Sequence, residues 1–167
     1  MQDLPLPIPL LLGALGLVVL LALLIAFFRS SSKPPYQRRE EFLSPAELNF
    51  FRTLEKAVDP DFYIFSKVRI ADLLCVIEGT ENYRGWFARI SQKHIDFVLA
   101  NREAVVPVLA IELDDSSHGR LDRQERDEFV DASLEAAGLP LLRVRVQQEY
   151  PLKELAAAIR ARITPKS

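Results

Sequence analysis

The distribution of apolar residues divides the chain into two regions. From Leu10 to Phe28, 19 consecutive residues lack a polar side chain. A helix of that length spans about 28 Å, close to the hydrocarbon thickness of a bilayer. A cleaved signal peptide would begin with bases and end its shorter apolar run in small residues. This run has no base before it and ends in Phe27-Phe28-Arg29. We therefore predict a retained transmembrane helix over residues 10–28, preceded by a short external tail over 1–9.

Charges on either side of the apolar run predict its orientation. Only Asp3 precedes it, whereas four bases follow it closely: Arg29, Lys33, Arg38 and Arg39. Because bases are enriched on the cytoplasmic side of membrane proteins, we expect a single-pass protein of the bacterial inner membrane. Its N-terminus would lie outside and its C-terminal domain in the cytoplasm. Residues 29–42 combine serines, prolines and mixed charges without a periodic apolar face, which predicts a juxtamembrane linker.

The remaining region, residues 43–164, alternates between helical and strand patterns. Apolar periodicity predicts four strands, over 62–70, 95–100, 105–113 and 141–146. It predicts four helices, over 44–58, 84–91, 122–137 and 152–163. In the second of these helices, three residues are expected to face inward: Trp86, Phe87 and Ile90. This order predicts a three-layer α/β domain with a mixed central sheet flanked by helices.

Composition narrows the class of protein. The 167 residues include 21 Lys and Arg, 23 Asp and Glu, and a single cysteine. The part beyond the linker, about 120 residues, is long enough to close one core. One cysteine excludes a disulfide framework and a multi-cysteine zinc site. The near-neutral charge gives no generic basic surface of the kind that drives nucleic-acid binding.

Acidic residues interrupt two of the apolar strands. Asp96 begins one strand, and Glu112 and Asp114 end the next. The short connection predicts an antiparallel hairpin. If its centre falls at residue 103 or 104, Asp96 lies opposite or diagonal to Glu112 on one face, and a one-residue shift would reverse this. Three carboxylates at one sheet end favour Mg²⁺ or Mn²⁺, and His118 in the following loop could handle protons. The competing interpretation is salt-bridged strand ends followed by a turn.

Three runs resemble the bacterial domain of unknown function 2726: KHIDFVL, AIELDDSSH and RQERDEFVDASLEAAGLPLLRV. They also resemble, more distantly, the Vsr-like branch of the PD-(D/E)xK nuclease superfamily. That branch shares a DF strand, an IELDG-like strand end, a nearby His, an R-D helix and a Gly followed by an Arg on the last strand. The resemblance covers roughly residues 43–160. It implies a restriction-endonuclease-like core that hydrolyses DNA phosphodiesters with Mg²⁺ or Mn²⁺, with DNA as a partner and the bilayer bound through residues 10–28.

The resemblance implies roles for individual residues. Asp96 and Glu112 match metal-binding acids, and the main-chain carbonyl of Leu113 would be a further ligand. Asp114 stands where the superfamily has its catalytic lysine, so Lys93 and His118 are candidates to compensate for the missing cation. The alternative function is a catalytically inactive nuclease-fold module that binds nucleic acid or protein at the membrane.

Four bases are candidate phosphate contacts: Lys67, Arg69, Arg126 and Arg143. Lys67 and Arg69 alternate with apolar residues and so line one strand face, for which an exposed edge is the competing interpretation. Arg126 belongs to the R-D helix. Arg143 matches the Arg of the final strand, where it would bind phosphate. The competing interpretations are a solvated face and partnering of the acids of the site.

One further acid has two interpretations. Glu47 is a candidate for the acid that such nuclease folds draw from their first helix. Ser44, Pro45 and Glu47 also form a capping box at the start of that helix, which explains the acid without catalysis.

Overall fold

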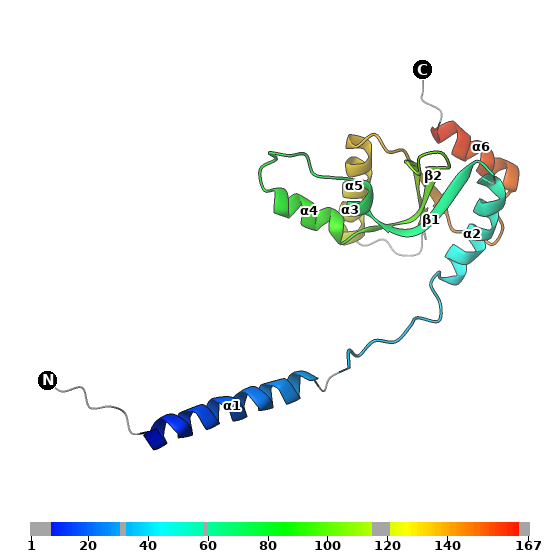
Figure 1. Cartoon of the computed structure of the whole chain (residues 1–167). Coiled ribbons are helices and arrows are strands. Elements are labelled where there is room, and N and C mark those ends of the chain that lie inside the picture. The colour runs from blue at the N-terminus through cyan, green and yellow to red at the C-terminus, as the bar shows by residue number, and fades with distance from the viewer. Residues whose placement is uncertain (1–7, 31–32, 59, 115–120, 164–167) are drawn as a thin grey trace. The chain divides into compact units, whose positions relative to one another are not determined.

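The structure is a computed structural model that describes residues 8–30, 33–58, 60–114 and 121–163 (Figure 1). The chain divides into two units, Met1–Glu40 and Glu41–Ser167. Among the described residues, the first unit holds one helix and the second holds an α/β domain, and each is described by itself.

The first unit contains α1 (Ile8–Ser30). Its stretch Ile8–Phe27 is the one helix in the described part of the chain that is long and apolar enough to cross a membrane, and none of it is buried. At a rise of about 1.5 Å per residue it is roughly 30 Å long, as a hydrocarbon core requires. The predicted span-length helix is therefore present near the N-terminus.

The second unit is a four-stranded sheet with helices on both faces. The strands are β1 (Phe62–Arg69), β2 (His94–Asn101), β3 (Pro107–Asp114) and β4 (Leu141–Arg145). The helices are α2 (Pro45–Val58), α3 (Ile70–Leu73), α4 (Tyr83–Ser91), α5 (Leu121–Ala136) and α6 (Leu152–Ile163). The strands lie in the order β1-β2-β3-β4; β2 is antiparallel to both β1 and β3, and β4 is parallel to β3. The prediction of a mixed sheet is confirmed, and α3 is a short helix that the sequence pattern did not predict.

Two apolar cores lie on the two faces of the sheet. One joins the sheet to α2 and α6 and is built around Phe50, Phe97 and Ile159. The other joins it to α3, α4 and α5 through Ile70, Ile90, Val130 and Leu134, among others. Figure 1 shows α2 and α6 on one side of the strands and α3 to α5 on the other. The predicted order of layers, helix on sheet on helix, is therefore present.

The hairpin between β2 and β3 fixes where the acidic residues lie. Phe97 pairs with Ile111, so the hairpin is centred on residue 104, as predicted. The Asn101 side chain closes the turn, because its Oδ1 accepts the N–H groups of Ala104 and Val106 at 3.1 Å each. The second strand of this hairpin, β3, begins at Pro107, two residues later than predicted. The cause is residue 105, which has a positive φ of 56° and belongs to the turn.

The prediction that Trp86 and Phe87 face inward is wrong. Both side chains are exposed, at 44% and 42%, and of the described α4 residues only Ile90 is buried. The cause is local, because α4 reaches the core only at its C-terminal end. There Ile90 packs with residues of α3, β2 and α5.

Candidate functional site

The strand ends of β2 and β3 bring two acids together. The pair Phe97 and Ile111 is the last that the ladder contains at this end. Asp96 and Glu112 are the next residues on the two strands, so both acids lie at this end of the hairpin. The register condition on which the sequence prediction depended is therefore met.

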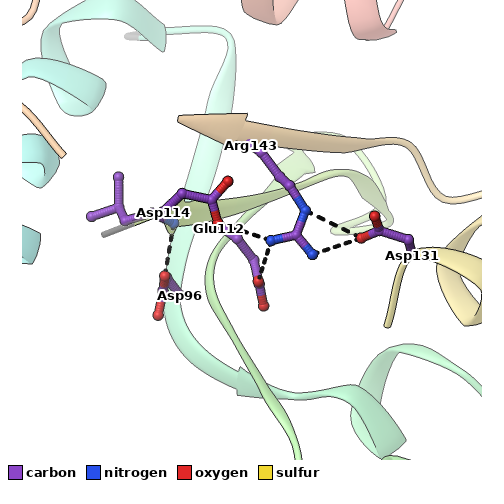
Figure 2. A network of polar contacts seen from close by, with 6 residues as sticks. Asp96, Glu112, Asp114, Asp131 and Arg143 are labelled. Carbon is purple, nitrogen blue, oxygen red and sulfur yellow. Dashed lines mark hydrogen bonds and ion pairs between the residues drawn. The ribbon is translucent and has the colours of Figure 1, made fainter. Parts of the chain in front are cut away.

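The Asp96 side chain crosses to the neighbouring strand. Its Oδ2 accepts the backbone N–H of Leu113 at 2.9 Å in a partly buried position. The Leu113 side chain itself packs against the core beneath α2 and α6. This hydrogen bond holds the carboxylate of Asp96 at the end of β3, beside Glu112 and Asp114 (Figure 2).

Arg143 joins the other acids into one network. It pairs with Glu112 in the parallel ladder between β3 and β4. Its Nη1 donates to Glu112 Oε2 at 3.3 Å and to Asp114 Oδ1 at 2.9 Å. On its other side, Nε and Nη2 donate to Asp131 Oδ1 of α5, at 3.3 and 2.7 Å (Figure 2). Of the interpretations of Arg143, the structure therefore supports partnering of the acids.

The environment of Arg143 keeps its guanidinium charged. Partial burial works to lower its pKa, but the hydrogen bonds to Asp131 and the charges of Glu112, Asp131 and Asp114 outweigh burial and raise the pKa above its ordinary value. Arg143 and Glu112 are the least exposed members, at 25% and 15%, whereas Asp114 and Asp131 are about half exposed. Three carboxylates contact this one guanidinium and Asp96 lies at the same end of the sheet, so the five residues together carry an excess of negative charge.

A second ion pair lies at the same end of the sheet. Lys67 Nζ donates to Glu47 Oε1 at 2.5 Å. The capping box is confirmed, since Glu47 Oε2 accepts the Ser44 N–H at 2.7 Å and Ser44 Oγ accepts the Glu47 N–H at 3.3 Å. Desolvation works to raise the pKa of Glu47, but the hydrogen bonds from Lys67 and Ser44 outweigh it and lower the pKa.

The backbone of Lys67 explains how this pair forms. Its φ is +53°, in the left-handed region that a lysine rarely adopts. The residue lies between the pairs Ser66–Phe97 and Val68–Ile95, level with Asp96. The positive φ interrupts the alternation along β1 at Lys67, and Lys67 and Arg69 have different acidic partners. Lys67 pairs with α2 on one face, while Arg69 Nη2 donates to Asp72 Oδ1 of α3 at 2.6 Å.

The remaining predicted site residues are Lys93, His118 and Arg126, which the structure describes to different extents. Lys93 Nζ donates to the Arg89 carbonyl at 3.1 Å and lies 4.9 Å from the centre of the Phe129 ring. His118 lies outside the described residues, and Arg126 is described for its backbone alone. Their predicted roles in proton handling and phosphate binding remain predictions.

Asp131 is a site residue that sequence reasoning missed. It belongs to a helix rich in charges, where an acid is ordinarily solvated, and its partner Arg143 lies on the following strand. Asp131 and Arg143 also line an open cavity of about 540 Å³, together with Glu135, Arg162 and the start of β4. The guanidinium thus lies between the carboxylates of the strand ends and this cavity.

The donor chemistry at the strand ends fits a hard divalent cation. Mg²⁺ is commonly held by one or two carboxylates, with water and substrate oxygens completing its shell. Asp96 and Glu112 supply such a pair of oxygen donors. Within the described ranges, which leave out 115–120, no group of three or more His, Cys, Asp or Glu side chains is arranged to hold a metal ion. The two acids therefore suit an ion that substrate and water help to bind.

Comparison with known proteins gives one match. The sequence model of a family described as "Protein of unknown function (DUF2726)" matches residues 39–163. No curated protein and no solved structure matches the chain. The matched range contains the whole α/β domain, including both ion-pair networks at the strand ends.

Proposed function

Starting from a chain that belongs to the DUF2726 family, we propose that its α/β domain is a membrane-anchored, Mg²⁺-dependent nuclease that hydrolyses DNA phosphodiesters, with Mn²⁺ as a substitute ion. The observation that carries this proposal is that Asp96 and Glu112 directly follow the last pair of the β2–β3 ladder, with Asp96 held to β3 by the Leu113 N–H. Acids at strand ends of an apolar hairpin are costly unless a cation or a hydrogen-bond donor compensates them.

The order of features along the chain supports a restriction-endonuclease-like fold for this domain. The Asp-Phe dipeptide lies on β2, the Ile-Glu-Leu-Asp run ends β3, and Arg126-Asp127 lie on α5. Gly138, with a φ of +69°, precedes β4 and its Arg143. These are the features, in the same order, on which the resemblance to the PD-(D/E)xK superfamily rests.

The residues divide into those that hold the ion and those that hold the acids. Asp96, Glu112 and the Leu113 carbonyl would bind the ion, and the hydrogen bond from the Leu113 N–H sets the position of Asp96. A divalent ion bound there supplies an activated water and charge stabilisation at the phosphate. Arg143 holds Glu112 and Asp114 in place by direct hydrogen bonds.

Arg143 would also supply the positive charge that the superfamily's catalytic lysine provides. Asp114 occupies the lysine position, two residues after Glu112 and on the same strand face. The guanidinium of Arg143 reaches that position from β4, 2.9 Å from Asp114 Oδ1. In this proposal the cation is supplied by the neighbouring strand, and its role is electrostatic, because a guanidinium does not give up its proton. Lys93 and His118 remain further candidates, and Lys67, held by Glu47, is a phosphate contact level with Asp96.

The membrane anchor is part of the same proposal. The helix Ile8–Phe27 would cross the bacterial inner membrane with its N-terminus outside. Asp3 before it and the bases after it favour a cytoplasmic domain. A short linker would then keep the domain close to the bilayer.

A specific observation favours a second candidate function, a catalytically inactive module that binds nucleic acid or protein. Arg143 already donates to Glu112 and Asp114, as a structural ion pair would. Under this proposal the domain would neither bind Mg²⁺ at the strand ends nor cut DNA.

Nicking of supercoiled plasmid by the full chain in detergent micelles separates the two candidates. We expect nicking with Mg²⁺ or Mn²⁺ and none with EDTA. Asp96→Asn should abolish nicking while leaving the fold intact, because the amide oxygen still accepts the Leu113 N–H. Glu103→Gln, in the turn at the other end of the hairpin, is the matched control. Equal nicking by wild type and Asp96→Asn would refute the assignment.

A further inference from the structure

One helix face in the domain is apolar yet only partly covered. Tyr83, Trp86, Phe87 and Ile90 recur at helical spacing along α4, so they lie on one face. Only Ile90 is buried; Tyr83, Trp86 and Phe87 are each more than 40% exposed. We call the three exposed rings, with the bases that surround them, the α4 surface.

Cations are stacked on the rings of this surface. The guanidinium of Arg89 lies 5.1 Å from the centre of the Trp86 ring and 3.9 Å from that of Phe129 on α5. The Lys93 ammonium lies 4.9 Å from the Phe129 ring. These distances are in the range of cation–π contacts. The bases are therefore held against the rings, with a charged rim beside an exposed π-face.

The charge of the segment points to an anionic ligand. Residues 82–95 contain Arg84, Arg89 and Lys93 and no acid. The nearest acids in sequence are Glu81, in the loop before the helix, and Asp96 of the candidate site, directly after the segment. Alternating rings and bases on one helix form the combination that binds single-stranded nucleic acid, in which bases stack on the rings and phosphates pair with the cations.

A short segment of chain joins the α4 surface to the candidate site. The chain passes from the end of α4 at Ser91 into β2 and reaches Asp96 within five residues. On the other side, Phe129 belongs to α5, the helix whose Asp131 holds Arg143. A strand bound across α4 would therefore lead toward the acids at the sheet end.

We propose that the α4 surface binds unpaired bases of single-stranded DNA, with Trp86 as the stacking ring and Arg84 and Arg89 as phosphate contacts. This inference rests on the proposed nuclease function and names the form of its substrate. Stacking on a protein ring needs a base face that is not already stacked in a duplex. The substrate is thus a single strand, or a duplex region with unpaired bases.

Trp86 is the only tryptophan of the chain, so its fluorescence reports directly on this surface. The full chain in neutral detergent micelles is titrated with a 20-residue oligonucleotide of dT in EDTA, which separates binding from cleavage. We expect quenching of Trp86 emission by the single strand and much weaker quenching by a duplex of equal length. The fluorescence anisotropy of end-labelled dT then measures the Kd of each variant for the single strand.

Two variants and a matched control test the residues. Trp86→Ala should raise the Kd for dT by about 5- to 150-fold, the cost of one stacked base. Trp86→Phe should restore most of the lost affinity. Arg84→Gln should lower the salt slope of binding by about 0.7, as for one lost phosphate contact on a single strand. Tyr63→Ala should change neither value. Tyr63 is 41% exposed and lies 4.7 Å from the Arg102 guanidinium, but at the opposite end of the sheet.

Several outcomes would overturn the inference. These are dT binding that Trp86→Ala leaves unchanged, equal affinity for single strand and duplex, or no response to dT. A blue shift of Trp86 emission with anionic lipid vesicles but not with dT would identify a membrane surface instead. If nicking depends on Asp96 but dT binding is the same with and without Trp86, this inference is overturned and the proposed nuclease function stands. Binding that depends on Trp86 without any nicking would overturn only the nuclease.

Discussion

Replacement of Arg143 by methionine removes the cation that three acids share while keeping most of the apolar stem. The contact with Glu112 should contribute most, because both side chains are largely buried, and a hydrogen bond to a charged group is worth about 1.5–3 kcal/mol. The contacts to Asp114 and Asp131 are half exposed and should add well under 1 kcal/mol each. We expect the free energy of unfolding to fall by about 2–3 kcal/mol.

Urea unfolding of the full chain in micelles, followed by circular dichroism, measures this change. The raised pKa of Arg143 keeps it charged at every accessible pH, so the loss should not vary with the titration of the arginine itself. Arg145→Met is the control, since this arginine lies two residues later on the same strand and is exposed. It should cost less than 0.5 kcal/mol, as surface substitutions usually do. A similarly small loss for Arg143→Met would refute the network as a source of stability.

The same variant tests whether the acids hold a divalent ion. With the guanidinium gone, the local charge is more negative, so Mg²⁺ should bind more tightly to the variant than to wild type. Binding at 100 times Kd stabilises a fold by about 2.7 kcal/mol. Added Mg²⁺ should therefore raise the Tm of Arg143→Met by several degrees more than that of wild type. Equal shifts would show that Mg²⁺ does not bind at these carboxylates.

Two further predictions concern the pair Glu47 and Lys67. Glu47→Ala should lower the unfolding free energy by about 1 kcal/mol through loss of the capping box. The lowered pKa of Glu47 means that its contribution is present above the ordinary value of 4.5 and is lost as pH falls through the folded value. Urea midpoints between pH 3 and 7 should thus converge for variant and wild type at the acid end, and a constant gap would contradict this. Lys67→Gly should be about 1 kcal/mol more stable than Lys67→Ala, because glycine accepts the φ of +53°; equal midpoints would refute strain at this residue.

Local patterns predicted the parts of the site that depend on neighbours in sequence. Ser44 and Glu47 form their capping box within one turn, so a four-residue pattern is enough. The short connection between β2 and β3 fixed the hairpin, and its register then placed Asp96 and Glu112 at the same end of it. In both cases the chain between the partners is too short to allow many arrangements.

The remaining parts depend on packing between distant segments. The amphipathic pattern of α4 shows which residues share a face, but it does not show whether a neighbour covers that face, so Trp86 was misplaced. Alternation on β1 is interrupted at Lys67, because a single positive φ reverses the direction of a side chain. Asp131 meets Arg143 only after the chain crosses over from α5 to β4, and nothing local distinguishes that acid from its solvated neighbours.

The orientation of the membrane helix can be read from the only cysteine. Cys75 has an exposed side chain in the α/β domain, so a maleimide reagent can reach it without unfolding. If the domain is cytoplasmic, a membrane-impermeant maleimide should leave Cys75 unlabelled in intact spheroplasts and label it after the inner membrane is permeabilised. A Cys75→Ser chain with Gln2→Cys in the N-terminal tail should show the reverse, with labelling before permeabilisation. Labelling of Cys75 in intact spheroplasts would place the domain outside, away from cytoplasmic DNA, and would contradict both the proposed orientation and the nuclease function that depends on it.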